Sequence, residues 1–219
     1  MGGTEPMDYP QIGLTAALLT FFTVIGIGVV SLTHEKTAAD IARNEHLALV
    51  QRLSAVLPVG EYDNDPSADR LSLPPDPRLG TRAPSTAWLA RREGRVVAVV
   101  LAPVARGGYS GDIHLLVGAR LDGTLTGVRV TQHKETPGLG DPIEESKSDW
   151  IHRFTGKSLG NPAPSGWAVK KDGGAFDQFT GATITPRAVV GAVRSALEYV
   201  RDESPRLMQE KPDVRSSPD

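Results

Sequence analysis

The feature that most constrains this chain is an uncharged, mostly apolar stretch of about 21 residues, 12–32, close to its N-terminus. As an α-helix rising about 1.5 Å per residue, this stretch is long enough to cross a hydrocarbon core about 30 Å thick. A cleaved signal peptide is the competing interpretation, but its apolar region is usually only about 7–15 residues long and follows a basic segment. Residues 1–11 contain no Lys or Arg. We therefore expect a transmembrane helix at 12–32, preceded by a short tail.

The charges that flank this span do not decide which side of the membrane the remainder occupies. Lys36, Arg43 and Arg52 follow the span, whereas Glu5 and Asp8 precede it. The positive-inside rule therefore weakly favours a cytoplasmic domain, but long domains cross membranes largely regardless of charge. From charge alone the topology stays open.

Length and composition exclude several classes of protein. The 219 residues suffice for one domain of ordinary size plus an anchor and tails. The net charge is −2 and the basic residues are scattered, so we expect no nucleic-acid partner. The chain has no cysteine, which excludes disulfides, thiolate-ligated iron–sulfur clusters and covalent c-type haem on this chain. Redox chemistry would need another cofactor.

The pattern after the span predicts a linker and then an antiparallel sheet. Apolar residues at helical spacing predict a helix that ends before Pro58, and the Asp-, Pro- and Ser-rich residues 60–84 indicate an irregular surface segment, so that 33–84 forms the linker. Predicted strands then follow in two pairs, which turn at a Glu-Gly and at an Asp-Gly dipeptide. These strands are 88–90, 95–102, 111–118 and 127–132.

The C-terminal third contains one clear helix. Residues 148–154 favour a short helix, and 167–171 favour a strand that runs into an Asp-Gly-Gly turn. A longer helix is predicted from 186 to 201, with Thr185 as its N-cap and Pro186 in its first turn. The charged tail beyond Ser204 is expected to fray.

The segment before that helix has the composition of an anion site. Gly181 and Ala182 let the backbone approach a bulky group, and hydroxyls stand at Thr180, Thr183 and Thr185. The unpaired amides and the dipole of a helix N-terminus favour a phosphate. An ordinary Thr- and Gly-containing loop has the same composition, so composition alone does not decide between the two interpretations.

A resemblance to a known family gives this segment a specific meaning. Asp-Gln-Phe-Thr-Gly-Ala-Thr, residues 177–183, resembles the D-x-x-[ST]-G-A-T pattern of flavinylated subunits in the Rnf/Rsx and sodium-pumping NADH:quinone reductase complexes. The resemblance implies that Thr183 carries FMN through a phosphoester bond, that Asp177 belongs to the recognition signal of a flavin transferase, and that Thr180, Gly181, Ala182 and Thr185 bind the cofactor. Such a bond fixes the cofactor by its inert end and leaves the isoalloxazine ring free for electron exchange.

The resemblance extends over most of residues 95–200 and is specific to the G subunit. It is carried by Tyr-Ser-Gly at 109–111, Leu-Leu-Val-Gly at 115–118, His-Lys-Glu-Thr-Pro-Gly-Leu-Gly-Asp at 133–141, Ser-Asp-Trp at 148–150 and Trp-Ala-Val-Lys-Lys-Asp-Gly-Gly at 167–174. It implies an α+β fold, in which one transmembrane helix precedes an FMN-binding domain at 85–203 with a mostly antiparallel sheet flanked by helices, and a flexible tail at 204–219. The Pro-rich segment and the Lys- and Arg-free N-terminus depart from the family pattern.

The loop at 135–141 has two interpretations. By pattern it is a turn whose glycines supply positive φ. The resemblance places it against the flavin, so that Glu135, Thr136, Gly138 and Leu139 form a second set of cofactor contacts, with Leu139 packing on the apolar face of the ring.

Neither a metal site nor a catalytic group is indicated. The histidines lack zinc-ligand spacing, and Asp122, Asp141 and Asp149 stand beside turn or cap signals. We therefore expect no metal and no catalytic nucleophile or acid–base residue.

The resemblance also implies a function. It is that of an electron-transfer subunit in a translocase, an ion-translocating oxidoreductase that couples ferredoxin and NAD redox chemistry to ion transport, and it is incomplete without the other subunits. The soluble domain would lie on the periplasmic side of the bacterial inner membrane. Two alternatives remain: a membrane-tethered ligand- or peptide-binding module without flavin, and a flavin enzyme acting on a small substrate, for which the sequence offers no acid–base pair.

Overall fold

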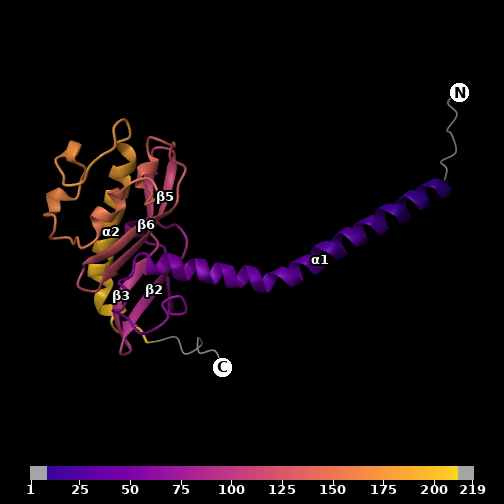
Figure 1. Cartoon of the computed structure of the whole chain (residues 1–219), viewed down its shortest axis with the longest axis horizontal. Helices are drawn as coiled ribbons and strands as arrows, with labels where there is room; N and C mark the ends of the chain where they lie inside the picture. The colour runs from indigo at the N-terminus through magenta and orange to yellow at the C-terminus, as the bar shows by residue number, and fades with distance from the viewer. Residues whose placement is uncertain (1–8, 212–219) are drawn as a thin grey trace. The chain divides into compact units, whose positions relative to one another are not determined.

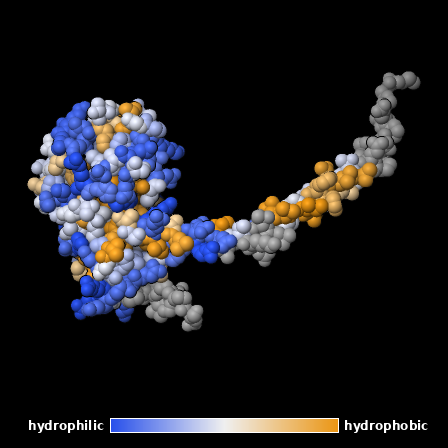
Figure 2. Space-filling view, in the orientation of Figure 1, coloured by the Kyte–Doolittle hydropathy of each residue, from blue (hydrophilic) through white to orange (hydrophobic). Residues whose placement is uncertain are grey.

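A computed structural model describes residues 9–211, which fall into two compact units divided between Ala48 and Leu49. Helix α1 (Tyr9–Ser54) forms the described part of the first unit up to Ala48, and its last residues, 49–54, belong to the second unit. Within α1, Gly13–Ser31 is long and apolar enough to cross a membrane and is not buried against protein. Figure 2 shows apolar side chains all along this part of the helix. A helix that is apolar all round suits a membrane span, and the described stretch agrees with the predicted one at 12–32.

The second unit is built on a six-stranded antiparallel sheet (Figure 1). The order β1-β2-β3-β5-β4 runs along one path, and β6 pairs with the other edge of β5. The C-terminal half of β5 pairs with β3 and its N-terminal half with β4. The strands are β1 (Arg70–Leu73), β2 (Ser85–Arg92), β3 (Arg95–Leu101), β4 (Val104–Gly108), β5 (Gly111–Arg120) and β6 (Leu125–Gln132).

Helices cover the two faces of this sheet. Helix α2 (Ile184–Leu207) buries an apolar face of Val189, Val193 and Leu197 in the larger core. On the opposite face the end of α1 contributes Leu53 and Val56 to a smaller core with residues of β2, β3 and β5. This arrangement of an apolar helix, an antiparallel sheet and flanking helices is the fold class that the resemblance implied.

Two glycines seat the end of α1 on the sheet. Gly118 and Gly127 are cross-strand partners on β5 and β6. A Cβ at Gly118 would overlap the carbonyl oxygen of Val56, and a Cβ at Gly127 would lie 2.9 Å from its Cα. Thr126 donates its hydroxyl to the same carbonyl at 2.5 Å. The chain therefore needs glycine at both positions for α1 to join the sheet this closely.

Short 3-10 turns complete the unit. The region predicted as a short helix is a 3-10 helix at Asp149–Phe154, capped by the Ser148 side chain. The others are Pro77–Leu79, Asp141–Ile143, Pro164–Gly166 and Lys170–Asp172.

Several local predictions were wrong in detail. Residues 70–73, in the predicted irregular segment, form the edge strand β1, and β4 was not predicted. Residues 167–171 are a single bridge from Val169 to Phe176 followed by a 3-10 turn, because a Cβ-free Gly174 lets the chain fold back onto the Ala168 carbonyl. Helix α2 continues to Leu207, which is buried, and so extends past the predicted start of the tail at 204. Residues 212–219 of that tail and 1–8 of the predicted N-terminal tail lie outside the described residues. Thr185 is not the N-cap, because its hydroxyl is bonded to the Glu135 side chain and Thr183 occupies the N-cap position.

Candidate functional site

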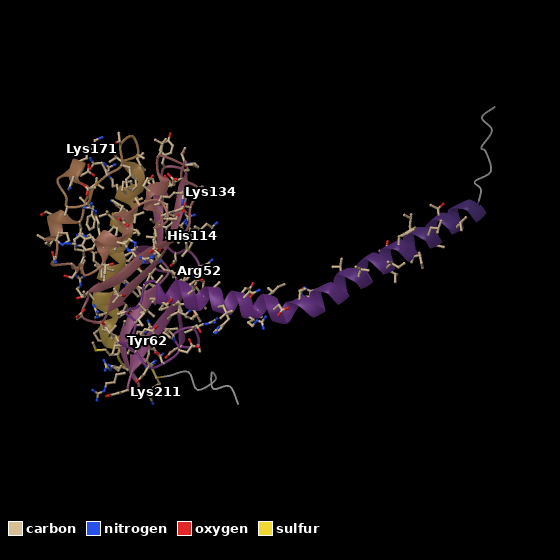
Figure 3. The ribbon with its side chains drawn as sticks, in the orientation of Figure 1. Arg52, Tyr62, His114, Lys134, Lys171 and Lys211 are labelled. Carbon is tan, nitrogen blue, oxygen red and sulfur yellow. The ribbon has the colours of Figure 1, made fainter. Side chains whose placement is uncertain are left out.

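A cavity of about 200 Å³ lies where three segments of the second unit meet. The β4–β5 hairpin contributes Tyr109, the loop after β6 contributes Glu135, Thr136, Leu139 and Gly140, and the approach to α2 contributes Gly181, Ala182 and Thr185. In Figure 3 the labelled Lys134 marks the end of the unit at which the loop after β6 begins, whereas Tyr62 and Lys211 lie toward the other end.

Glu135 holds these three segments together. Its carboxylate is buried, with Oε1 accepting a hydrogen bond from the Ser110 backbone N–H at 2.9 Å and Oε2 accepting one from the Thr185 hydroxyl. Its own backbone N–H donates to His133 Nδ1 at 3.0 Å. One side chain thus links the hairpin, the loop after β6 and the first turn of α2.

Glycines make room for this buried carboxylate. A Cβ at Gly108 would lie 2.9 Å from Glu135 Oε1, and a Cβ at Gly140 would lie 2.8 Å from both Glu135 Cβ and Oε2. Real Cβ atoms are not found so close to other heavy atoms. The glycine before Tyr109 and the last glycine of the 135–141 loop are therefore part of the packing around Glu135.

Thr185 lies inside the first turn of α2 and is completely buried. The sequence suggested an N-cap because threonine hydroxyls often accept from the N–H groups of a helix start. The hydroxyl instead donates to the carboxylate of Glu135, fifty residues away in sequence. The N-cap position belongs to Thr183.

Thr183 occupies the N-cap position of α2, but its hydroxyl does not cap the helix. Its backbone is helical (φ −72°, ψ −28°), its side chain makes no capping hydrogen bond, and it is half-buried. Its carbonyl accepts the N–H of Arg187 at 3.3 Å. The preceding turn is tight, because the Ala182 N–H donates to the Phe179 carbonyl at 3.1 Å and Gly181 adopts φ +80°. The Thr183 hydroxyl therefore lies at the N-terminus of α2, directly after a turn that contains Gly181 and Ala182.

The structure brings most of the predicted cofactor residues together. Six of them line the cavity, namely Glu135, Thr136, Leu139, Gly181, Ala182 and Thr185. Thr183 lies between two lining residues without lining the cavity itself, and Thr180 and Gly138 are exposed outside it. Tyr109 and Gly140 line it as well and were not predicted. The sequence signal that could have pointed to Tyr109 is its place in Tyr-Ser-Gly at 109–111, one of the segments that carry the family resemblance.

Asp177 is anchored by cations from two 3-10 segments. Its carboxylate pairs with Lys170 Nζ at 2.5 Å and Arg153 Nη1 at 3.0 Å, and its carbonyl accepts the indole N–H of Trp150 at 2.7 Å. The hydrogen bond from Lys170, followed by the charges of Lys170 and Arg153, holds the pKa of this carboxyl below its usual value. The carboxylate is about one-third exposed, so it stays accessible at the surface.

An aromatic cluster supports the same segment from inside. Phe176 stacks on Phe154 with ring centroids 4.6 Å apart, and Phe179 meets Trp150 edge-on at 5.3 Å. Such pairs contribute about 0.5–1.5 kcal/mol beyond the area they bury. The chain is therefore held firmly on both sides of Asp177 before it enters the Gly181 turn.

A second ion pair stands one helical turn after Thr183. Arg187 Nε and Nη2 donate to the two carboxylate oxygens of Asp172 at 2.7 and 2.9 Å. This fork lowers the pKa of Asp172 from its usual value and raises that of Arg187. It ties the start of α2 to the 3-10 turn at Lys170–Asp172.

A larger open groove of about 480 Å³ lies along β6 and the 144–146 segment. Here His133 Nε2 and Glu144 Oε1 are 2.7 Å apart, and the hydrogen bond from His133 is the main cause that lowers the pKa of Glu144. Because His133 Nδ1 accepts from Glu135, Nε2 carries the proton that is donated to Glu144. Among the described residues, no group of three or more His, Asp or Glu side chains is arranged to hold a metal ion.

Comparisons with known proteins match both units. The model of the RnfG N-terminal region matches residues 7–56, and that of the FMN-binding domain matches 108–198. The G subunit of the ion-translocating oxidoreductase complex of Pseudomonas aeruginosa strain UCBPP-PA14 is 52% identical over 193 residues, covering 88% of this chain and 90% of that protein. The protein of the same name from Vibrio cholerae (serotype O1, strain ATCC 39541) is 45% identical over 190 residues, covering 87% and 90%.

Among solved structures, the crystal structure of Shewanella oneidensis NqrC aligns with a TM-score of 0.45 at 23% identity, covering 71% of this chain and 74% of that one. The FMN-binding match spans all three segments that meet at the cavity. The N-terminal match ends at Val56, the residue seated over the two glycines of the sheet.

Proposed function

The chain belongs to the family of G subunits of ion-translocating oxidoreductase complexes, and from this premise we propose that it carries FMN esterified to Thr183. The coarse function follows from membership: it is an electron-transfer subunit of a membrane-bound oxidoreductase complex, and FMN is the cofactor of its domain. The single observation that carries the proposal is the position of the Thr183 hydroxyl, which makes no capping hydrogen bond at the start of α2 and follows a residue that lines a small cavity.

The residues present fit an FMN bound in this way. The cavity of about 200 Å³ is smaller than the ~300–1,000 Å³ pockets that enclose small ligands, so it can cover only part of the cofactor. A shallow site gives little affinity without a covalent bond, and an ester to the chain removes the need for a deep pocket. The first amides of α2 and the helix dipole favour the phosphate of that ester.

The side chains around the cavity then have distinct tasks. Gly181 leaves space, because a Cβ there would meet only Leu139, at 3.7 Å. Leu139 and Thr136 offer contacts from the opposite loop, and Glu135 fixes that loop against α2 without needing to touch the cofactor. When bound, FMN supplies reversible electron transfer. The chain supplies attachment, orientation and an open side toward a partner.

The redox partners and location follow from the same proposal. The complex would relay electrons between ferredoxin and NAD chemistry and couple their flow to ion transport. A chain without cysteine can hold no thiolate-ligated cluster, and the FMN-binding match at 108–198 makes a flavin the group it would bring to such a relay. We place α1 in the bacterial inner membrane, with a single pass at 13–31, and the second unit on the periplasmic side.

Maturation would need a flavin transferase. Asp177 and the 180–183 segment would form its recognition surface, and the ion pairs of Asp177 would present that surface in one conformation.

Mass spectrometry tests this proposal. Trypsin cleaves after Lys171 and Arg187, so Thr183 lies on the peptide 172–187. Protein from a host that possesses the transferase should carry the mass of FMN less one water on this peptide, retained after acid denaturation. Thr183→Ala should abolish the adduct, whereas Ser165→Ala, which removes an exposed hydroxyl outside the 177–183 segment and outside the cavity, should keep an adduct on Thr183. An unmodified Thr183 in such a host would favour a membrane-tethered binding module without flavin.

A further inference from the structure

Tyr109 is the most exposed large side chain at the cavity. It is 71% exposed although it lines the cavity together with Leu139, which is 46% exposed. A tyrosine buries much apolar area when covered, so an uncovered ring beside a cavity is a surface for a ligand. Its hydroxyl has no hydrogen-bond partner among residues 9–211.

The hairpin presents Tyr109 from a fixed position. Gly107 and Gly111 adopt positive φ (+82° and +131°), and Gly108 packs against the Gly111 carbonyl and Glu135 Oε1. The next residue, Ser110, donates its backbone N–H to the same carboxylate. Tyr109 is therefore the one large side chain on a turn that Glu135 pins to the start of α2.

The cavity is too small to enclose an FMN, so Tyr109 can contact the part that lies outside it. Part of an FMN attached at Thr183 must extend beyond a cavity of about 200 Å³, and Tyr109 is the aromatic side chain among its lining residues. We infer that Tyr109 forms the aromatic wall of the flavin site, with its phenol ring packed against the isoalloxazine ring. This inference rests on the proposed function, because it requires FMN on Thr183.

Contact between the Tyr109 ring and the flavin can be detected by fluorescence, independently of electron-transfer activity. A phenol in van der Waals contact with an oxidised flavin donates an electron to the excited ring, and the electron then returns, so that fluorescence is quenched without net chemistry. The ring also shields one flavin face from solutes such as iodide. Phenylalanine shields equally well but is a much poorer electron donor, so Tyr109→Phe separates the two effects.

The test uses the full-length, flavinylated chain in detergent. Tyr109→Phe should lengthen the flavin fluorescence lifetime severalfold while quenching by iodide stays as in the unsubstituted protein. Tyr109→Leu should lengthen the lifetime and also increase iodide quenching. Tyr62→Leu is the matched control and should change neither, because Tyr62 packs on the smaller core toward the other end of the unit (Figure 3).

The possible results distinguish a failure of the inference about Tyr109 from a failure of the proposed attachment of FMN to Thr183. If every variant carries FMN on Thr183 by mass spectrometry and Tyr109→Phe leaves the lifetime unchanged, the inference is wrong and the attachment stands. If the unsubstituted chain carries no FMN there, the proposed function itself fails. Tyr109→Phe removes only an exposed hydroxyl, so loss of folding does not complicate the decisive variant.

Discussion

Replacing Thr185 with valine tests whether the bond to Glu135 holds the site together. Valine has the shape of threonine but cannot donate a hydrogen bond, and at this completely buried position it leaves Oε2 of Glu135 without its donor. A hydrogen bond to a charged group contributes about 1.5–3 kcal/mol. The second unit is in the size class of about 150–250 residues, in which 1 kcal/mol shifts Tm by about 2–4 °C. We therefore expect Tm to fall by about 3–12 °C.

The assay is thermal unfolding of the full-length chain in detergent, followed by near-ultraviolet circular dichroism. The buried Trp150 and Trp167 report on the second unit, and α1 contains no tryptophan. Thr180→Val is the control and should change stability by less than about 0.5 kcal/mol, because Thr180 is exposed.

A double-mutant cycle isolates the pair. In a Glu135→Gln background the acceptor is neutral, so Thr185→Val should cost only about 0.5–1.5 kcal/mol. If Thr185→Val changed the stability as little as Thr180→Val does, the bond between Thr185 and Glu135 would not hold the start of α2 against the loop after β6. The flavin yield of Thr185→Val should fall together with its stability, because the same bond positions the start of α2.

Two further predictions concern the surface. Because pairing with Lys170 depresses the pKa of Asp177 below its ordinary 3.8, any stabilisation from this pair is present above that pH and is lost as the pH falls through the depressed pKa. Lys170→Met should therefore raise the Asp177 pKa toward 3.8 in an NMR titration, and an unchanged midpoint would contradict the pairing. The chain has no cysteine, so Val59→Cys at a site 86% exposed gives a single thiol. In cells with a permeable outer membrane, a reagent that cannot cross the inner membrane should label it; labelling only after lysis would place the domain in the cytoplasm.

Features that depend on near neighbours in the chain were accessible from the sequence. The span at 13–31 follows from its length and lack of charge, and the strands β2, β3, β5 and β6 follow from apolar runs bounded by turn dipeptides. Helix α2 follows from its 3.6-residue apolar periodicity. The Thr-Gly-Ala-Thr segment was found because its meaning is carried by contiguous residues. In each case the deciding interactions lie within a few residues of one another.

Features that depend on distant residues were decided by the tertiary structure. The edge strand β1 exists because β2 offers its hydrogen-bonding edge, which the polar composition of 60–84 does not reveal. The hydroxyl of Thr185 serves Glu135 in place of a helix cap, because burial leaves that carboxylate no water to bind. Tyr109 reaches the cavity only because β4 and β5 form a hairpin that Glu135 pins beside α2. The sequence by itself thus determined that a Thr-Gly-Ala-Thr segment precedes the last helix. Folding alone decided which threonine occupies the N-cap position and which side chains surround it, since a buried charge selects its partners in space and not along the chain.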